Sequence, residues 1–207
     1  MYKIIFPLLV GCFLLWPFAA AAQENAPAFS PFAGIKLGGA LHSVFSELGP
    51  AAQVELEGGV TLLGGRLDVA LTGAWDRATA SGGGDDARFD AGSVSWELDQ
   101  DFLMIGLIAR YRFLPPTQAY NAYAGAGPRL LLMQTTVNGD AGGADLGENR
   151  QTETRFGAVL VGGGEYVLGP GAVLLEVAMG VGSLSGLITG ESSASALSLL
   201  LGYRLRF

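Results

Sequence analysis

Hydrophobic and polar residues alternate along most of the chain beyond residue 31, with the period of two that is typical of a β-strand with two different faces. The alternation predicts eight strands of about ten residues, the length at which a tilted strand crosses a membrane. We place these strands at residues 32–41, 51–60, 67–76, 102–113, 120–134, 154–168, 173–182 and 197–207. The pattern therefore predicts an all-β protein.

One face of every predicted strand is apolar, and the other face carries charges of both signs among glycine and alanine. The charges on this second face are Lys36, Glu55, Glu57, Asp68, Asp76, Arg110, Arg112, Arg129, Arg155, Glu165, Glu176, Arg204 and Arg206. A register shift of one residue would turn them toward lipid, at a cost of roughly 2–4 kcal/mol for each Arg or Lys at the membrane centre. A soluble β-sandwich also alternates, but small residues between charges suit the tight interior of a small barrel better.

The connections between the predicted strands alternate in length. The short ones are rich in Gly or Pro and span 61–66, 114–119 and 169–172. The long ones span 77–101, 135–153 and 183–196. Short turns at one rim and long loops at the other are typical of transmembrane barrels. We therefore predict an eight-stranded antiparallel up-and-down transmembrane β-barrel.

Aromatic side chains predict where this barrel would meet the membrane surface. The aromatic residues at strand ends beside the short connections are Tyr111, Phe113, Tyr120 and Tyr166. This is the position of the interfacial aromatic girdle of transmembrane barrels. Trp75 and Phe156 would mark the opposite interface.

The first residues have the order of a secretory signal. Residues 1–22 contain Lys3, then an apolar run, then small residues as far as Ala22. We expect cleavage after Ala22, which leaves 23–31 as a short N-terminal lead and 32–207 as the barrel. An uncleaved membrane anchor is the alternative, but proline and glycine interrupt an apolar run that is shorter than the roughly 20 residues of a spanning helix.

Composition narrows the possible chemistry. Cys12 is the only cysteine and lies in the expected signal, so the mature chain would have neither a disulfide nor a CxxC metal site. Only Lys3 of the 12 basic residues is lost with the signal, whereas all 19 acidic residues remain. Such a chain is an improbable partner for nucleic acid. With a mean hydropathy of +0.38 and 15% charged residues, it is also too apolar for an ordinary soluble surface.

We expect the inward charges other than Glu55 and Asp76 to form a network that plugs the lumen. Asp68 would pair with Arg110 or Arg112, and Glu176 would pair with Arg204 or Arg206 on the neighbouring strand. Removing one partner of a buried ion pair costs roughly 3–5 kcal/mol. A charge relay or an ion path through the same residues is the alternative interpretation.

Toward the long-loop rim the inward positions become small or apolar. They are Ala40, Ala74, Met104, Ile108, Leu131, Val159, Gly180 and Gly182. A dry pocket at this level would accept a hydrophobic molecule, whereas ordinary packing of these side chains would fill the space. Eight strands leave room for side chains or for one small ligand, so a general porin is not expected.

His42, the only histidine, is the candidate residue for catalysis, because some small barrels are lipid-modifying enzymes with a His-centred site. Ser43 and Ser46 lie nearby, but a triad also needs a group that orients the histidine. The carboxylates that remain conceivable for this role are Glu47, Asp76 and Asp101. We expect a solvated loop histidine and no enzyme. The acidic residues of the long loops lack the spacing of a calcium loop, so we expect no metal site and no cofactor.

The end of the chain resembles the C-terminal signal by which the outer-membrane assembly machinery recognises β-barrel clients. The matching residues are Gly202, Tyr203, Leu205 and the terminal Phe207. Residues 108–113 and 123–127 also look like the fourth and fifth strands of the superfamily that includes the OmpA transmembrane domain, OmpX and OmpW. The resemblance implies an outer-membrane protein of a Gram-negative-type bacterium. Its implied partners are outer-membrane lipids and, during biogenesis, periplasmic chaperones and the barrel assembly machinery.

Taken with the residue pattern, this resemblance favours a structural role or a role of the surface loops, in envelope integrity, adhesion or the binding of an unknown partner. A narrow channel or carrier for small hydrophobic solutes, which OmpW-type barrels would imply, is the alternative. A lipid-modifying barrel enzyme comes third.

Overall fold

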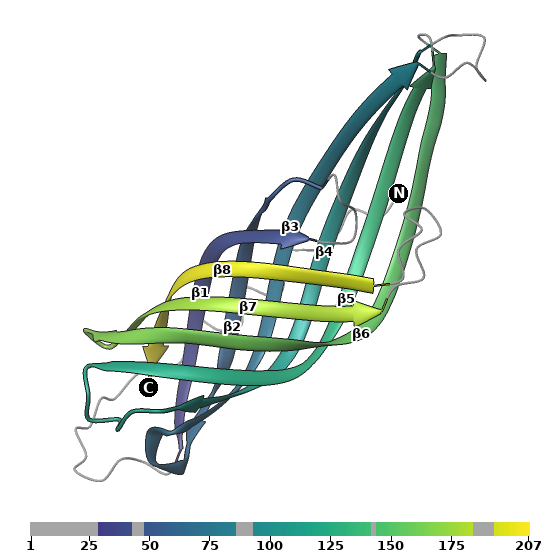
Figure 1. Ribbon diagram of the computed structural model, residues 1–207. Helices are drawn as coiled ribbons and strands as arrows, with labels where there is room; N and C mark the ends of the chain where they lie inside the picture. Colours follow the sequence, from purple (N-terminus) through teal and green to yellow (C-terminus); the bar gives the residue numbers. More distant parts are fainter. Residues whose placement is uncertain (1–28, 43–47, 86–92, 142–143, 184–192) are drawn as a thin grey trace.

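The computed structural model describes residues 29–42, 48–85, 93–141, 144–183 and 193–207. Its strands are β1 (Ser30–His42), β2 (Ala51–Leu62), β3 (Leu67–Asp85), β4 (Ser93–Arg112), β5 (Tyr120–Ala141), β6 (Ala144–Leu168), β7 (Gly171–Ser183) and β8 (Ser193–Arg206). All neighbours are antiparallel and consecutive in sequence, and β1 pairs with β8 to close the barrel (Figure 1). The predicted eight-stranded up-and-down barrel is therefore confirmed.

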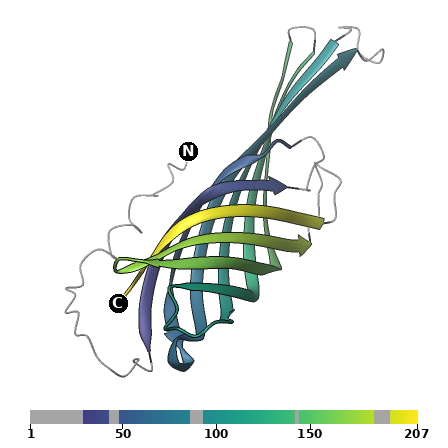
Figure 2. The same ribbon diagram turned by 60° about the vertical axis from the view of Figure 1, so that its left-hand side comes forward.

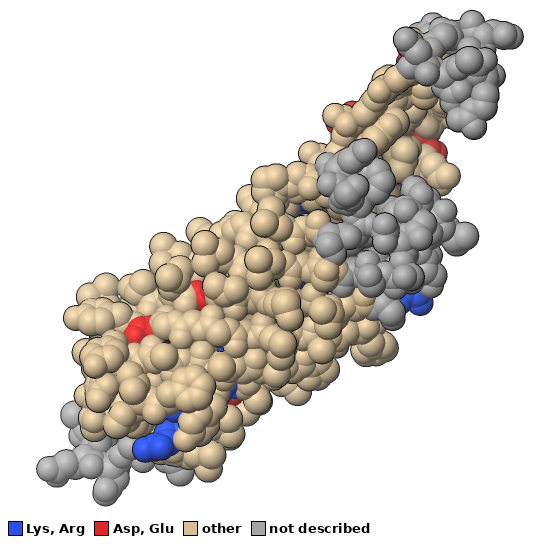
Figure 3. All heavy atoms as spheres, viewed as in Figure 1, with Lys and Arg blue, Asp and Glu red and all other residues tan. Residues whose placement is uncertain are grey.

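Each strand alternates between a buried inward side chain and an exposed outward one. In β4, for example, Met104 and Ile108 are buried, whereas Ile105 and Leu107 are about half exposed. The same parity continues around the ring because every pair of neighbouring strands keeps its register over most of its length. The wall seen in Figure 3 is accordingly almost free of charge, and lipid is the solvent that such a wall fits.

Short connections gather at one end of the barrel, which we call the short-turn rim. The β2–β3 connection contains the short 3-10 helix η1 (Leu63–Gly65), in which Gly64 and Gly65 take positive φ angles of 63° and 94°. Glycine suits these two positions because it has no Cβ to clash there. The predicted girdle residues Tyr111, Phe113, Tyr120 and Tyr166 are 43–61% exposed, and their role at a membrane interface stays a prediction.

Strands β3 to β6 are longer than we predicted, which corrects the assignment of 77–101 and 135–153 as long loops. β3 and β4 stay paired as far as Asp85 and Ser93. The β5–β6 hairpin also continues, to the pair of Ala141 with Ala144. Apolar alternation fades in these segments, yet each strand still has a backbone partner, so the ladder continues beyond the apolar wall.

β4 and β5 also pair with each other as far as Val94 and Ala141. The two hairpins therefore form one continuous four-stranded sheet that projects beyond the other strands (Figures 1 and 2). We call this part, residues 77–85, 93–101, 133–141 and 144–153, the projecting sheet. We call the end of the barrel from which this sheet projects the hairpin rim.

The predicted signal, residues 1–22, and most of the lead lie outside the described residues, so their assignment stays a prediction. β1 begins at Ser30, two residues before the predicted start. In the part of the chain that the structure describes, no helix has the length and hydropathy to cross a membrane.

Candidate functional site

The interior contains a cluster of charges centred on Lys36 of β1, whose side chain is fully buried. Its Nζ atom lies 2.7 Å from a carboxylate oxygen of Glu55, 3.1 Å from one of Glu57 and 2.7 Å from one of Glu176. These acids come from β2 and β7, on both sides of the lumen. Lys36 therefore connects strands that are not neighbours.

Arg110 of β4 supplies the second cation at this level. Its guanidinium lies 2.8 Å from Glu57 and 3.4 Å from Glu176. Tyr123 of β5 donates a hydrogen bond of 2.9 Å to the same oxygen of Glu176, Oε2, whereas Lys36 contacts Oε1. Tyr123 is a residue that the sequence pattern did not single out. Its inward parity, opposite to that of Tyr120, was the available signal.

Arg204 of β8 forms the next layer toward the short-turn rim. It contacts Glu57 at 2.5 Å and Asp68 at 2.9 Å. Its guanidinium also lies 4.5 Å from the ring centroid of Phe32, in a cation–π contact. Arg204 thus extends across β1 to reach acids of β2 and β3.

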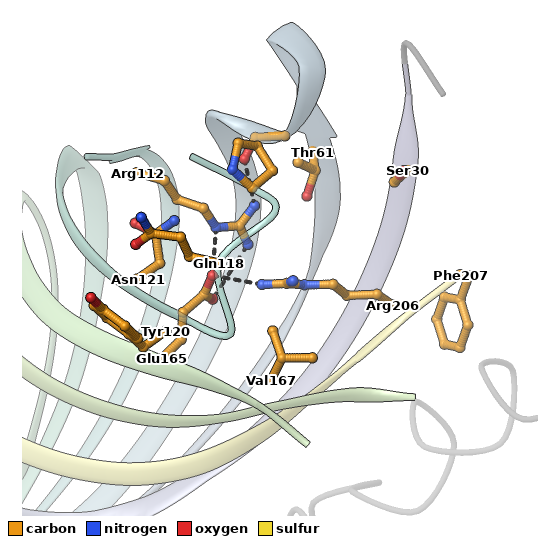
Figure 4. Close-up of a pocket in the computed structure, with 12 residues that line it drawn as sticks. Ser30, Thr61, Arg112, Gln118, Tyr120, Asn121, Glu165, Val167, Arg206 and Phe207 are labelled. Carbon is orange, nitrogen blue, oxygen red and sulfur yellow. Dashed lines mark hydrogen bonds and ion pairs between the residues drawn. The ribbon is translucent and has the colours of Figure 1, made fainter. Parts of the chain in front are cut away.

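The last layer lies at the short-turn rim and contains Arg112, Glu165 and Arg206. Arg112 contacts Asp68 and Glu165, each at 2.8 Å, and donates a hydrogen bond of 3.0 Å to the carbonyl of Gly65. Arg206, on the opposite side of the cavity, has its Nη2 atom 2.7 Å from a carboxylate oxygen of Glu165. Figure 4 shows both arginines pointing toward this carboxylate.

We call these residues the charge cluster. Its five cations are Lys36, Arg110, Arg112, Arg204 and Arg206, and its five acids are Glu55, Glu57, Asp68, Glu165 and Glu176. Because the two signs are equal in number and alternate in space, the cluster buries no net charge. That balance is what makes such burial tolerable, since an unpaired buried charge would be far more costly.

One predicted pair is wrong. Glu176 was expected to bind Arg204 or Arg206 on β8, but it binds Lys36, Arg110 and Tyr123. In the ladder Glu176 lies opposite Leu200. Long side chains that point into a narrow ring can reach strands on its far side, so the neighbouring strand does not decide the pairing. Asp68, in contrast, does bind Arg112, as expected.

Two arginines assigned to the network lie apart from the charge cluster. Arg129 points inward nearer the hairpin rim, where its Nη1 atom is 3.2 Å from the sulfur of Met104. Arg155 is partly exposed, with Glu153 3.7 Å away. Arg129 borders a cavity of about 20 Å³, roughly enough for one water molecule.

Above this cavity the interior is packed with apolar side chains, which we call the apolar plug. Its buried members are Ala51, Ala74, Ala78, Phe102, Met104, Leu131 and Met133. Ala74, Met104 and Leu131, three of the inward positions for which we considered a dry pocket, are thus packed against other apolar side chains.

His42 lies on the apolar plug and not in solvent, which corrects our expectation of a solvated loop histidine. Its ring stacks on Phe102 with centroids 4.1 Å apart and planes inclined by 3°. Its Nε2 atom lies 2.8 Å from Asp76, and both side chains are buried. Of the two candidate carboxylates that the structure describes, Asp76 and Asp101, it is Asp76 that contacts His42, whereas Glu47 lies outside the described residues. Ser43 and Ser46, the candidate nucleophiles, lie outside the described residues.

No group of three or more metal-binding side chains occurs in the described ranges of the chain. The chemistry available to the interior is therefore that of ion pairs, of one buried histidine–carboxylate pair and of a polar pocket at the short-turn rim. That pocket has a volume of about 370 Å³ and opens beside Arg112, Glu165 and Arg206.

The residues of the predicted assembly signal also have structural roles. A Cβ atom on Gly202 would lie 2.6 Å from the side chain of Lys36, so glycine lets the lysine stem pass β8. The hydroxyl of Tyr203 donates a hydrogen bond of 2.7 Å to the carbonyl of Leu168, and the amide of Phe207 donates one of 2.9 Å to the carbonyl of Pro31. Leu205 stays on the outer face. Recognition by an assembly machinery stays a prediction.

A closed ring of eight antiparallel strands, apolar outside and filled with paired charges, has the architecture of the small outer-membrane β-barrels. Among solved structures, Neisserial surface protein A (NspA) has this fold, with a TM-score of 0.51 and 22% identity over 89% of this chain and 100% of that one. OprG from Pseudomonas aeruginosa has a TM-score of 0.44 and 14% identity, over 87% and 96%. No protein-family profile matches the chain, and no curated protein matches it.

Proposed function

We propose that this chain is an integral outer-membrane barrel that is closed to solutes and acts at the cell surface through its projecting sheet. The observation that carries the proposal is the contrast between a filled lumen and a large ordered sheet beyond the apolar wall. Transport requires an open interior, whereas a surface role requires an accessible sheet on a stable base.

The filled lumen supports the closed state. The charge cluster occupies the half near the short-turn rim, and the apolar plug occupies the half near the hairpin rim. The space between them has room for roughly one water molecule. A small solute would have to displace ion pairs and packed side chains together.

The projecting sheet supports the surface role. Arg77–Asp85, nine residues of β3, continues past Trp75, and at about 3.3 Å per residue it extends roughly 30 Å along the strand. Its outward side chains are mostly polar, and Glu97, Asp99 and Asp140 are the acidic ones among them that β4 and β5 contribute beyond Asp101. Arg77 lies 2.7 Å from Asp99 on this face. Such a surface is suited to water and to a polar partner, not to lipid.

Cysteine labelling on intact cells tests the location and the orientation. Because Cys12 is the only cysteine, each probe is made together with Cys12→Ser. A membrane-impermeant maleimide should label Ser81→Cys on intact cells. It should label Thr117→Cys, at the short-turn rim, only after the membrane is permeabilised. Leu71→Cys, on the apolar wall, should resist labelling both on intact cells and after permeabilisation. If intact cells label Thr117→Cys but not Ser81→Cys, the orientation is opposite to the proposed one, and the proposal is contradicted.

Shortening both hairpins tests the surface role itself. A variant that joins Ala78 to Gln100 and Thr135 to Gln151 by tight turns keeps cross-strand partners at both ends of each cut. We expect it to fold and insert, and to give cells the same surface phenotype as a strain that lacks the gene. If cells with the shortened barrel behave like cells with the native barrel, the projecting sheet does not carry the function.

A further inference from the structure

The pocket at the short-turn rim is a cavity with charged side chains in its lining. It measures about 370 Å³. Arg112, Glu165 and Arg206 provide the charged side chains of its lining, and Gln118 and Tyr120 add an amide and a phenol at its edge (Figure 4). The proposed function, which rests on the closed lumen and the projecting sheet, gives this pocket no role.

The two arginines of the pocket differ in how fully their donors are used. Arg112 binds Asp68, Glu165 and the carbonyl of Gly65, and its side chain is 4% exposed. Arg206 contacts Glu165 through Nη2, while its Nε atom is buried without a hydrogen-bond partner in the described residues. Its side chain is 30% exposed. Arg206 therefore contacts fewer groups than Arg112 and is the more exposed cation of the pocket.

Glu165 is surrounded by more positive charge than one carboxylate balances. Arg112, Arg206 and Arg204 lie 2.8, 2.7 and 3.6 Å from it. Asp68, the next acid, is already shared between Arg112 and Arg204. A second anion that enters the pocket would meet Arg206 on one side, and would leave Glu165 with its remaining partners, Arg112 and Arg204.

We propose that this pocket binds the carboxylate of a small organic acid, with Arg206 as its main partner. The planar fork of a guanidinium can donate two parallel hydrogen bonds to a carboxylate. A shift of the Arg206 side chain away from Glu165 would uncover its buried Nε–H and free the adjacent Nη2 for these two bonds. Gln118, which lines the pocket, can donate to the remainder of the ligand. Arg112 stays in place and holds Glu165 inside the charge cluster.

Binding of simple anions to the refolded full-length barrel in detergent micelles tests this site. Acetate, succinate and inorganic phosphate are titrated separately while the NMR signal of the Arg206 Nε–H group is followed. We expect saturable shifts with the two carboxylates, which Arg206→Gln weakens at least about tenfold, the loss that corresponds to about 1.4 kcal/mol. Phosphate that saturates the site at lower concentration than either carboxylate would contradict the proposed ligand class.

Two further variants separate this site from a general effect of charge. Arg66→Gln removes an arginine at the same rim, which is exposed and lies 3.4 Å from the hydroxyl of Tyr111, outside the pocket. Its effect on affinity should be small. Arg206→Lys keeps the charge without the fork and should recover only part of the affinity. Equal losses in Arg66→Gln and Arg206→Gln, or full affinity in Arg206→Lys, would overturn the proposal, as would the absence of saturation with folded native protein.

Discussion

The two halves of the lumen are filled in opposite ways, although the same strands pass through both. Near the short-turn rim, ten charged side chains contact one another across the ring. Near the hairpin rim, Phe102, Met104 and Leu131 pack with alanines against one another. The first half depends on having a partner for every charge, and the second depends on shape and volume. A barrel of fixed strand number can thus be closed by either means.

The two halves also differ in whether their contacts join neighbouring strands or strands that are far apart in the ring. In the apolar plug, β4 and β5 contribute four of the seven members and are neighbours in the ring. In the charge cluster, Lys36 joins β1 to β7 and Arg204 joins β8 to β3. The charge cluster therefore ties together strands that are distant in sequence, so a defect there should affect the whole ring.

Lys36→Met should have the largest effect. It leaves Glu55, Glu57 and Glu176 without their common cation, and we expect a loss of roughly 3–5 kcal/mol in the free energy of unfolding. Urea unfolding in lipid vesicles measures this. Planar bilayers should also record current steps in the variant and none in the native barrel. A stable, silent variant would show that the charge cluster does not hold the lumen closed.

Leu131→Ala opens a cavity in the apolar plug and should cost about 2–5 kcal/mol, the usual range for a buried leucine. The side chain is only 4% exposed. Because the charge cluster remains intact below it, this variant should stay silent in the bilayer. Current comparable to that of Lys36→Met would mean that the two halves close the lumen jointly and would remove the contrast between them.

Tyr123→Phe should have a moderate effect. It removes one hydrogen bond to Glu176, which keeps Lys36 and Arg110. We expect a loss of about 1.5 kcal/mol, at the low end for a hydrogen bond to a charged group. Urea unfolding at pH 7 measures it. A loss as large as that of Lys36→Met would show that Tyr123 and not Lys36 holds Glu176.

Arg77→Gln should have the smallest effect and serves as the control outside the lumen. Its ion pair with Asp99 is exposed, with Arg77 50% accessible. Pairs of this kind contribute at most about 1 kcal/mol, and salt screens them. The free energies of unfolding of the variant and of the native protein, measured at low and at high salt, should converge as the salt concentration rises. A persistent difference would indicate that the projecting sheet stabilises the barrel below it.

Much of the barrel could be predicted from the sequence because alternation in a strand has a fixed period. The apolar parity of Leu103, Ile105 and Leu107 required a lipid-like exterior, and the opposite parity of Arg110 and Arg112 required an interior. Proline and glycine marked the short connections. These features depend only on neighbouring residues, so a single chain displays them.

The projecting sheet was missed because its signal is not apolar. In β3 beyond Asp76 the buried inward positions are Ala78 and Ala80, and the outward residues Arg77, Thr79 and Ser81 are polar. Such a segment is predicted to be a loop when strands are recognised by their hydrophobic face. Its strands exist because β4 and β5 supply each other and their outer neighbours with backbone hydrogen bonds, which is a property of the pairing and not of any one segment.

The sequence by itself determined that this protein is a ring of eight antiparallel strands with charges inside and hydrophobic residues outside. Only the tertiary structure decided which charges meet. Lys36 is bound by acids of β2 and β7, and His42 is bound by Asp76 on β3. The reason is geometric: periodicity fixes the direction of a side chain, but its partner across a closed ring depends on tilt, on depth and on the reach of long side chains.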